Sequence, residues 1–124
     1  MSHKRAMLRA LGTEIARLHR AGFVHGDLTP YNLFVERGEP PCFTFVDHER
    51  TRWTRFASGR RRLRNLVQLG RFDLPGLSRT DRMRVLRAYA GMKSGATWRS
   101  LRQRGAAMLE RRIKRGGLEP ARRT

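Results

Sequence analysis

Residues 25–47 read HGDLTPYNLFVERGEPPCFTFVD, and this stretch contains the clearest structural pattern of the chain. Two β-prone runs, at residues 31–35 and 42–46, flank a short segment that contains one glycine and two prolines. This pattern predicts a β-hairpin with a connection of five to seven residues. Asn32 would begin the first strand and Asp47 would end the second, so antiparallel pairing would bring these two residues to the same end of the hairpin.

The rest of the chain is predicted to be mostly helical. Apolar residues at helical spacing, with capping residues and glycines at the ends, predict helices at residues 5–20, 63–70, 78–90 and 97–114. The polar, basic segment 48–62 is expected to be irregular, and residues 72–76 are expected to form a loop. We therefore predict an α+β, mostly helical domain at residues 1–115 and a frayed basic tail at residues 116–124.

The composition limits the classes of protein to which the chain can belong. Its 124 residues suffice for one small domain, but not for a two-lobed enzyme of ordinary size. We expect no membrane span and no secretory signal, and the lone Cys42, expected to be buried in a strand, excludes internal disulfides. These features fit a reducing cytoplasm. The 28 Lys and Arg against 10 Asp and Glu give a net charge of +18, which implies a nucleotide, a nucleic acid or an anionic membrane surface as partner.

The polar residues of this stretch follow the pattern H-x-D-x-x-x-x-N, from His25 to Asn32, and Asp47 follows the second β-prone run. Phosphoryl transfer needs such a set. One carboxylate orients the acceptor hydroxyl and takes its proton, while an amide oxygen and a second carboxylate hold Mg²⁺ against the nucleotide phosphates. The structural alternative makes Asp27 a turn residue, Asn32 a strand-start residue and Asp47 a cap. That alternative requires three coincidences in the right order.

Four segments carry a resemblance to a known family: HGDLTPYNLFV from residue 25, FVDHERTR from residue 45, RRRLRNLVQLGRF from residue 60 and SRTDRMRVLRAY from residue 78. They resemble the lipopolysaccharide core kinases, the Kdo/heptose kinase family of Gram-negative bacteria. The resemblance implies the C-terminal lobe of a protein-kinase-like fold with a catalytic-loop β-hairpin.

The same resemblance implies roles for individual residues. Asp27 would be the catalytic base, His25 a brace of the catalytic loop, and Asn32 and Asp47 the residues that bind Mg²⁺ and ATP. The implied activity is transfer of the ATP γ-phosphate to a sugar hydroxyl of the lipid A–core, or to another hydroxyl acceptor. The implied location is the cytoplasm, peripheral at the inner membrane.

The chain departs from the protein-kinase pattern at several positions. Gly26 replaces the arginine that often precedes the catalytic aspartate, Thr29 stands in place of a phosphate-contacting lysine, and His48-Glu49 replace Phe-Gly. Residues 1–124 contain no Gly-rich phosphate loop, strand lysine or partner glutamate of the kind that clamps ATP. We therefore expect a lobe–lobe face that takes up a separate N-terminal lobe or leads to self-association.

Four arginines after the hairpin, Arg60, Arg61, Arg62 and Arg64, are predicted to bind acceptor phosphates and the anionic membrane surface. Two other functions stay open beside the kinase. The first is a truncated, catalytically inactive kinase-like lobe or pseudokinase, and the second is a basic nucleic-acid-binding protein. Only the net charge favours nucleic acid, because zinc-finger spacing, an RNP-like aromatic strand and a recognition-helix signature are all missing.

Overall fold

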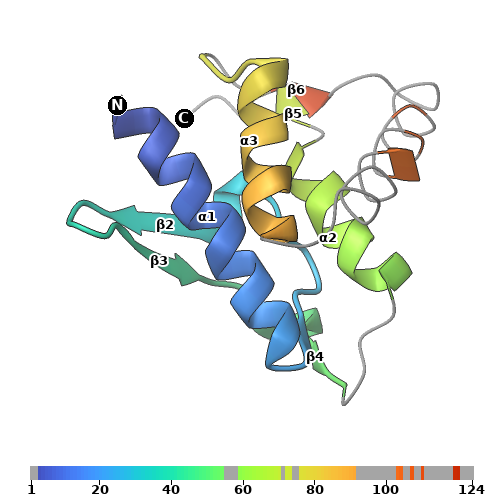
Figure 1. The fold of residues 1–124 in the computed structure, drawn as a ribbon. Coiled ribbons are helices and arrows are strands. Elements are labelled where there is room, and N and C mark those ends of the chain that lie inside the picture. Colours follow the sequence, from blue (N-terminus) through green and yellow to red (C-terminus); the bar gives the residue numbers. More distant parts are fainter. Residues whose placement is uncertain are drawn as a thin grey trace.

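Figure 1 shows the chain as a computed structural model, which describes residues 3–54, 59–70, 72–73, 76–91, 103–104, 107, 110 and 119–120. Its longer helices are α1 (His3–Arg20), α2 (Gly59–Gly70) and α3 (Arg79–Ala90). Its strands are β1 (Phe23–Val24), β2 (Leu33–Glu36), β3 (Cys42–Phe45), β4 (Arg52–Trp53), β5 (Phe72–Asp73) and β6 (Glu119–Pro120). Two 3₁₀ turns, η1 (Pro30–Asn32) and η2 (His48–Arg50), adjoin the hairpin. The mostly helical α+β architecture predicted from the sequence is confirmed.

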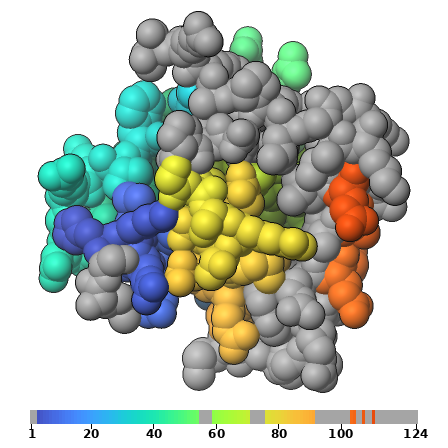
Figure 2. Space-filling model, turned by 90° about the horizontal axis from the view of Figure 1, so that it is seen from above, coloured from blue at the N-terminus to red at the C-terminus, as the bar shows by residue number. Residues whose placement is uncertain are grey.

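The core lies where α1 packs against α3. Leu8, Leu11 and Ile15 lie on one side of α1 and are buried with Val85 of α3, and Ile15 is fully buried. The two helices approach closely at Gly12, where an added Cβ would overlap the carbonyl oxygen of Val85. Figure 2 shows α1 in blue and α3 in yellow side by side on one face of the molecule.

The N-terminus of α3 is stabilised by a capping box and by an ion pair with α1. The Ser78 side chain accepts a hydrogen bond from the Asp81 backbone N–H, and the Asp81 side chain accepts one from the Ser78 N–H, which completes the capping box. Lys4 forms an ion pair with Asp81 at 2.6 Å. The hydrogen bond from Lys4 is the main reason why the pKa of Asp81 lies well below its ordinary value. The helix predicted to open at residue 78 is thus confirmed.

The predicted hairpin is also confirmed. Strands β2 and β3 pair antiparallel from Leu33↔Phe45 to Glu36↔Cys42, and the five residues between the strands form the connection. Phe43 and Phe45 pack against the core. Because side chains alternate along a strand, Cys42 lies on the other face and is exposed, so the expectation of a buried cysteine was wrong.

Two segments are more ordered than expected. Within residues 48–62, β4 pairs with β1 and α2 begins at Gly59, four residues before the predicted start. The first turn of α2 is made of arginines, so it has no apolar periodicity that could reveal a helix. Within the loop expected at residues 72–76, β5 pairs in parallel with β6. Residues 119–120, inside the predicted tail, form β6, and the rest of residues 116–124 lies outside the described residues.

The predicted helix at residues 97–114 lies largely outside the described residues. Within it, Gln103, Arg104, Ala107 and Glu110 are helical. In the part of the chain that the structure describes, no helix is long and apolar enough to cross a membrane.

Candidate functional site

The first part of the site is the loop between β1 and β2. After Asp27, the backbone turns through η1, whose last residue is Asn32. The Asn32 side chain folds back onto the loop, because its Nδ2 donates to the Asp27 carbonyl oxygen at 2.8 Å and reaches Asp27 Oδ2 at 3.4 Å. The structure therefore places these two motif residues in direct contact.

Asp47 completes the arrangement from the other strand of the hairpin. The Val46 N–H donates to the Asn32 carbonyl oxygen at 2.9 Å, which extends the pairing of β2 and β3 by one step. Asp47 then adopts a left-handed backbone conformation, with φ of 60°, and leads into η2. A cavity of about 190 Å³ is lined by Asp27, Asp47, Glu49 and Arg50. The two aspartates thus share one cavity, and Asn32 contacts it through Asp27.

These residues have the chemistry of a magnesium site. Mg²⁺ prefers oxygen ligands and takes one or two carboxylates from the protein, with water and substrate phosphates in the remaining positions. Asp47 brings a carboxylate to the cavity that it lines with Asp27, and Asn32, which contacts Asp27, carries an amide oxygen. Among the residues described, no three His, Cys, Asp or Glu side chains gather into a metal cluster. The donor set therefore fits a cation shared with phosphates better than an all-protein cage.

The buried His25 side chain connects the loop that carries Asp27 with the end of the hairpin that carries Asp47. It is 1% exposed, and its Nδ1 accepts a hydrogen bond from the Asp27 N–H at 3.0 Å. The other ring nitrogen, Nε2, therefore carries the proton and donates to the Val46 carbonyl oxygen at 2.8 Å. His25 thus joins the backbone before Asn32 to the end of β3, and it does not line the cavity.

Helix α2 holds the same loop through Asn65, a residue that sequence reasoning missed. Asn65 is 1% exposed, and its side chain pairs with both backbone groups of His25: Oδ1 accepts from the N–H at 3.0 Å, and Nδ2 donates to the carbonyl oxygen at 2.7 Å. Nδ2 also donates to Gln68 Oε1 at 3.0 Å, and that oxygen accepts from the Leu28 N–H at 3.3 Å. Two side chains of α2 therefore bind the backbone on both sides of Asp27.

The network continues into α1 and α3. His19 donates from Nε2 to Asn65 Oδ1 at 3.0 Å, and its Nδ1 accepts from the Tyr89 hydroxyl at 2.7 Å. Burial lowers the pKa of His19, the hydrogen bond with Asn65 opposes this shift, and the charge of Arg62 adds to it. Burial also raises the pKa of Tyr89. The sequence offers one weak sign of this network, namely two amide side chains three residues apart in an arginine- and leucine-rich helix.

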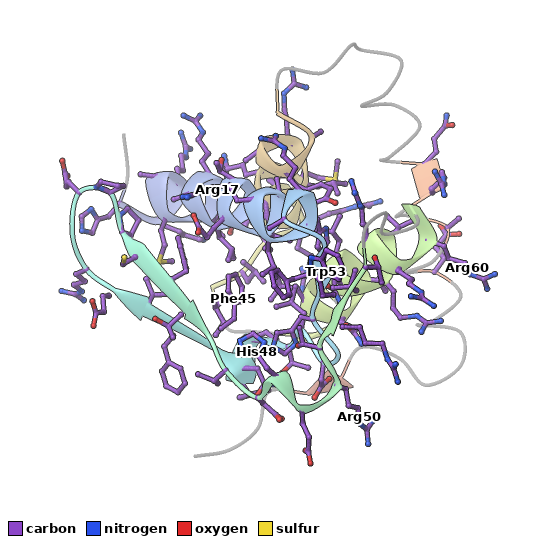
Figure 3. All side chains as sticks on the ribbon, turned by 90° about the horizontal axis from the view of Figure 1, so that it is seen from below. Arg17, Phe45, His48, Arg50, Trp53 and Arg60 are labelled. Atoms are coloured by element: carbon purple, nitrogen blue, oxygen red, sulfur yellow. The ribbon has the colours of Figure 1, made fainter. Side chains whose placement is uncertain are left out.

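The four arginines predicted to bind acceptor phosphates lie on α2. Arg60, Arg61 and Arg64 are exposed, whereas Arg62 is partly buried near His19. None of them is among the described residues that line the cavity with Asp27. Figure 3 shows Arg60 projecting from α2, well apart from Arg50.

A larger hollow, of about 440 Å³, lies between α1 and β3. It is lined by Glu14, Arg17, Leu18, Arg20, Ala21, Phe43 and Phe45. It contains none of the motif residues, so the smaller cavity at Asp27 is the better candidate for chemistry.

Comparisons with known proteins bear on the family and on the fold of the chain. The model of the "Lipopolysaccharide kinase (Kdo/WaaP) family" matches residues 1–89. The fold is similar to a solved structure of WaaP in complex with acyl carrier protein, with a TM-score of 0.73 and 25% sequence identity, over 90% of this chain and 48% of that one. The chain is also 37% identical over 41 residues to an EKC/KEOPS complex subunit of Schizosaccharomyces pombe. The aligned segment covers 33% of this chain and 17% of that protein. The chain thus spans about half the length of the solved relative, or less in the case of the yeast protein.

Proposed function

Because the chain belongs to the lipopolysaccharide kinase (Kdo/WaaP) family, we propose that it is the catalytic-loop lobe of an ATP-dependent kinase that phosphorylates a sugar hydroxyl of the lipid A–core. The observation that carries the proposal is the meeting of Asp27, Asn32 and Asp47 at one end of the hairpin. Asp27 contacts Asn32 directly and shares a cavity with Asp47. Membership of the family and the fold of WaaP support a kinase-like function independently of this geometry.

In this proposal, the Asp27 carboxylate accepts a hydrogen bond from the acceptor hydroxyl and takes its proton as the hydroxyl oxygen bonds to the γ-phosphorus. The bond from that phosphorus to the bridging oxygen breaks, and ADP leaves. Asn32 and Asp47 would hold Mg²⁺, which when bound neutralises charge on the phosphates. The His25 ring accepts a hydrogen bond from the Asp27 backbone N–H, and Asn65 in turn binds the backbone of His25. These contacts position the base before the substrate binds.

The charge of the chain supports the proposed acceptor. Lipid A–core is presented at an anionic membrane surface, where each Lys or Arg near the surface contributes about 1 kcal/mol of attraction. The three exposed arginines of α2 and the net charge of +18 suit such a surface. The proposed location is the cytoplasm, peripheral at the inner membrane. Because the solved WaaP is bound to acyl carrier protein, an acyl carrier protein is a further partner to test.

The second candidate is a catalytically inactive kinase-like lobe, because the hydrogen bonds that shape the Asp27 loop come from His25 and Asn65 and involve no nucleotide. In the proposed kinase, the nucleotide clamp comes from an N-terminal lobe, in the same chain or a separate one, or from self-association. The two candidates differ in their response to nucleotide. An active lobe should be stabilised against heat by millimolar ATP with Mg²⁺, whereas an inactive lobe should show no shift.

The direct test is the transfer of labelled phosphate from ATP to purified lipid A–core. Native protein should label the acceptor, and chelation of Mg²⁺ by EDTA should stop the reaction. Asp27→Asn preserves size and should lower the rate by about 100-fold or more, the contribution of a general base. Equal rates for the native chain and Asp27→Asn would remove Asp27 from the mechanism. Tight binding of nucleic acid at physiological salt in a gel shift, without transfer, would favour the nucleic-acid alternative instead.

A further inference from the structure

Arg50 is the one basic residue among those that line the cavity of Asp27 and Asp47. It is the last residue of η2, three positions after Asp47, and neither the spacing of the motif nor the arginine-rich run marks it. Its surroundings in the cavity are the carboxylates of Asp27, Asp47 and Glu49. Arg50 therefore brings a positive charge to a cavity whose other lining residues are acidic.

The backbone of Arg50 is packed directly onto the catalytic loop. At Gly26, an added Cβ would overlap the Cβ and the carbonyl carbon of Arg50. Gly26 is therefore needed where it stands, because any side chain there would displace Arg50. The space beside Gly26 is filled by the Cβ and the backbone of Arg50.

Hydrogen bonds fix the turn that carries Arg50. The Gly26 N–H donates to Thr51 Oγ1 at 3.3 Å, and the Thr51 hydroxyl donates to Nδ1 of His48 at 3.1 Å. The other ring nitrogen of His48 donates to the Phe45 carbonyl oxygen at 2.8 Å. One chain of hydrogen bonds thus runs from the catalytic loop through η2 to β3, and it sets the position from which the Arg50 side chain starts.

The guanidinium of Arg50 makes no hydrogen bond or ion pair with any described residue, even though three carboxylates line the same cavity. Arg17 and Arg84, by contrast, pair with Glu14 and Asp81. Figure 3 shows the Arg50 side chain projecting from η2 into solvent. Its five donors are therefore available to a ligand that enters the cavity from outside.

We propose that Arg50 binds a phosphate group at the mouth of this cavity, an inference that rests on the proposed kinase function. A guanidinium matches phosphate oxygens in a bidentate geometry, and its charge favours an oxyanion in a cavity otherwise lined by carboxylates. The phosphate comes either from the nucleotide, whose γ-phosphoryl group bears charge on its equatorial oxygens during transfer, or from a phosphorylated acceptor.

The experiment uses Arg50→Ala and the matched control Arg52→Ala. Arg52 is also exposed and lies two residues further along, but it does not line the cavity, so both variants lose the same charge. Calorimetry measures binding of Mg·ATP, and a second titration measures binding of lipid A–core before and after enzymatic removal of its phosphates. Thermal melting of both variants should match the native chain, because the Arg50 side chain has no partner among the described residues.

Arg50→Ala should lower the affinity for one of the two phosphate ligands by about tenfold or more, because a charge-assisted hydrogen bond is lost. Arg52→Ala should change the affinity less than twofold. Loss confined to Mg·ATP assigns the nucleotide phosphate, and loss confined to phosphorylated lipid A–core assigns the acceptor phosphate. If native protein binds these ligands and both variants bind them equally well, the role of Arg50 is overturned while the kinase proposal stands. If native protein binds neither ligand and transfers no phosphate, the kinase proposal itself is wrong.

Discussion

Replacement of Asn65 by leucine tests how far α2 supports the catalytic loop. Leucine has the same number of side-chain heavy atoms and the same branching at Cγ, but it removes all the hydrogen bonds of a side chain that is 1% exposed. The His25 N–H and carbonyl oxygen, which Asn65 binds at 3.0 and 2.7 Å, would remain buried without partners. The variant isolates this interaction because it creates little cavity.

The magnitude follows from the number of buried groups that lose their partners. Each such group costs about 1–3 kcal/mol, and part of the cost is recovered by burying the leucine side chain. We expect a net loss of about 3 kcal/mol, a large part of the roughly 5–15 kcal/mol that stabilises a domain. For a chain of this length, that loss lowers the melting temperature by about 10 °C.

The assay is thermal unfolding followed by circular dichroism, with Arg64→Leu as the control. Arg64 is the neighbouring residue on α2 and is exposed, so its replacement by leucine adds the same side chain without breaking a buried contact. The control should melt within about 2 °C of the native protein, as surface substitutions usually do. If Asn65→Leu melts at the same temperature as the control, the hydrogen bonds of Asn65 do not stabilise the loop.

Three further predictions address other contacts. Gly12→Ala places a Cβ against the Val85 carbonyl oxygen and should destabilise the α1–α3 packing by about 1–3 kcal/mol in urea unfolding, whereas Gly70→Ala, with open space around it, should not destabilise the fold. His19 is buried with a lowered pKa, so its contribution to stability is complete above its ordinary pKa and is lost as the pH falls toward the lowered value. Melting curves should show a smaller loss between pH 7 and pH 5 for His19→Gln than for native protein, and equal losses would contradict the assignment. Asp47→Asn should weaken Mn²⁺ binding, measured by paramagnetic resonance, by about tenfold or more, whereas Glu36→Gln on the hairpin should leave it unchanged.

The sequence predicts those parts of the fold and site that depend on local patterns. The two β-prone runs around a Gly/Pro-containing segment predicted the hairpin, and the pairing of Leu33 with Phe45 then explains why Asn32 and Asp47 lie at one end. The contribution of Asn65 could not be predicted, because its partners lie on His25 and His19, about 40 residues or more away in the chain. Every residue type except proline offers both backbone groups, so a hydrogen bond from Asn65 to the backbone does not restrict which residue stands at position 25. Such a contact therefore leaves no recognisable pattern in the sequence.

Arg50 escaped prediction for a different physical reason. An exposed arginine in a chain with 28 Lys and Arg gives no signal of its own, and only the overlap at Gly26 shows that its position is specified. A glycine forced by a distant side chain is indistinguishable in sequence from a glycine that simply serves a turn. The arginines of α2 present the opposite case, since their clustering was conspicuous but none of them lines the cavity among the described residues.

The two loops that carry Asp27 and Asp47 are joined without any contribution from a nucleotide. His25 links Asp27 to Val46, and Thr51 with His48 links Gly26 to Phe45. These contacts belong to residues 25–51 and to α2, so an active kinase lobe and an inactive one would share the same geometry here. Stability measurements on Asn65 or Gly12 therefore report on the architecture in either case. Only the ligand experiments on Asp27, Asp47 and Arg50 separate the two functions, because they ask whether phosphate and cation bind where these side chains meet.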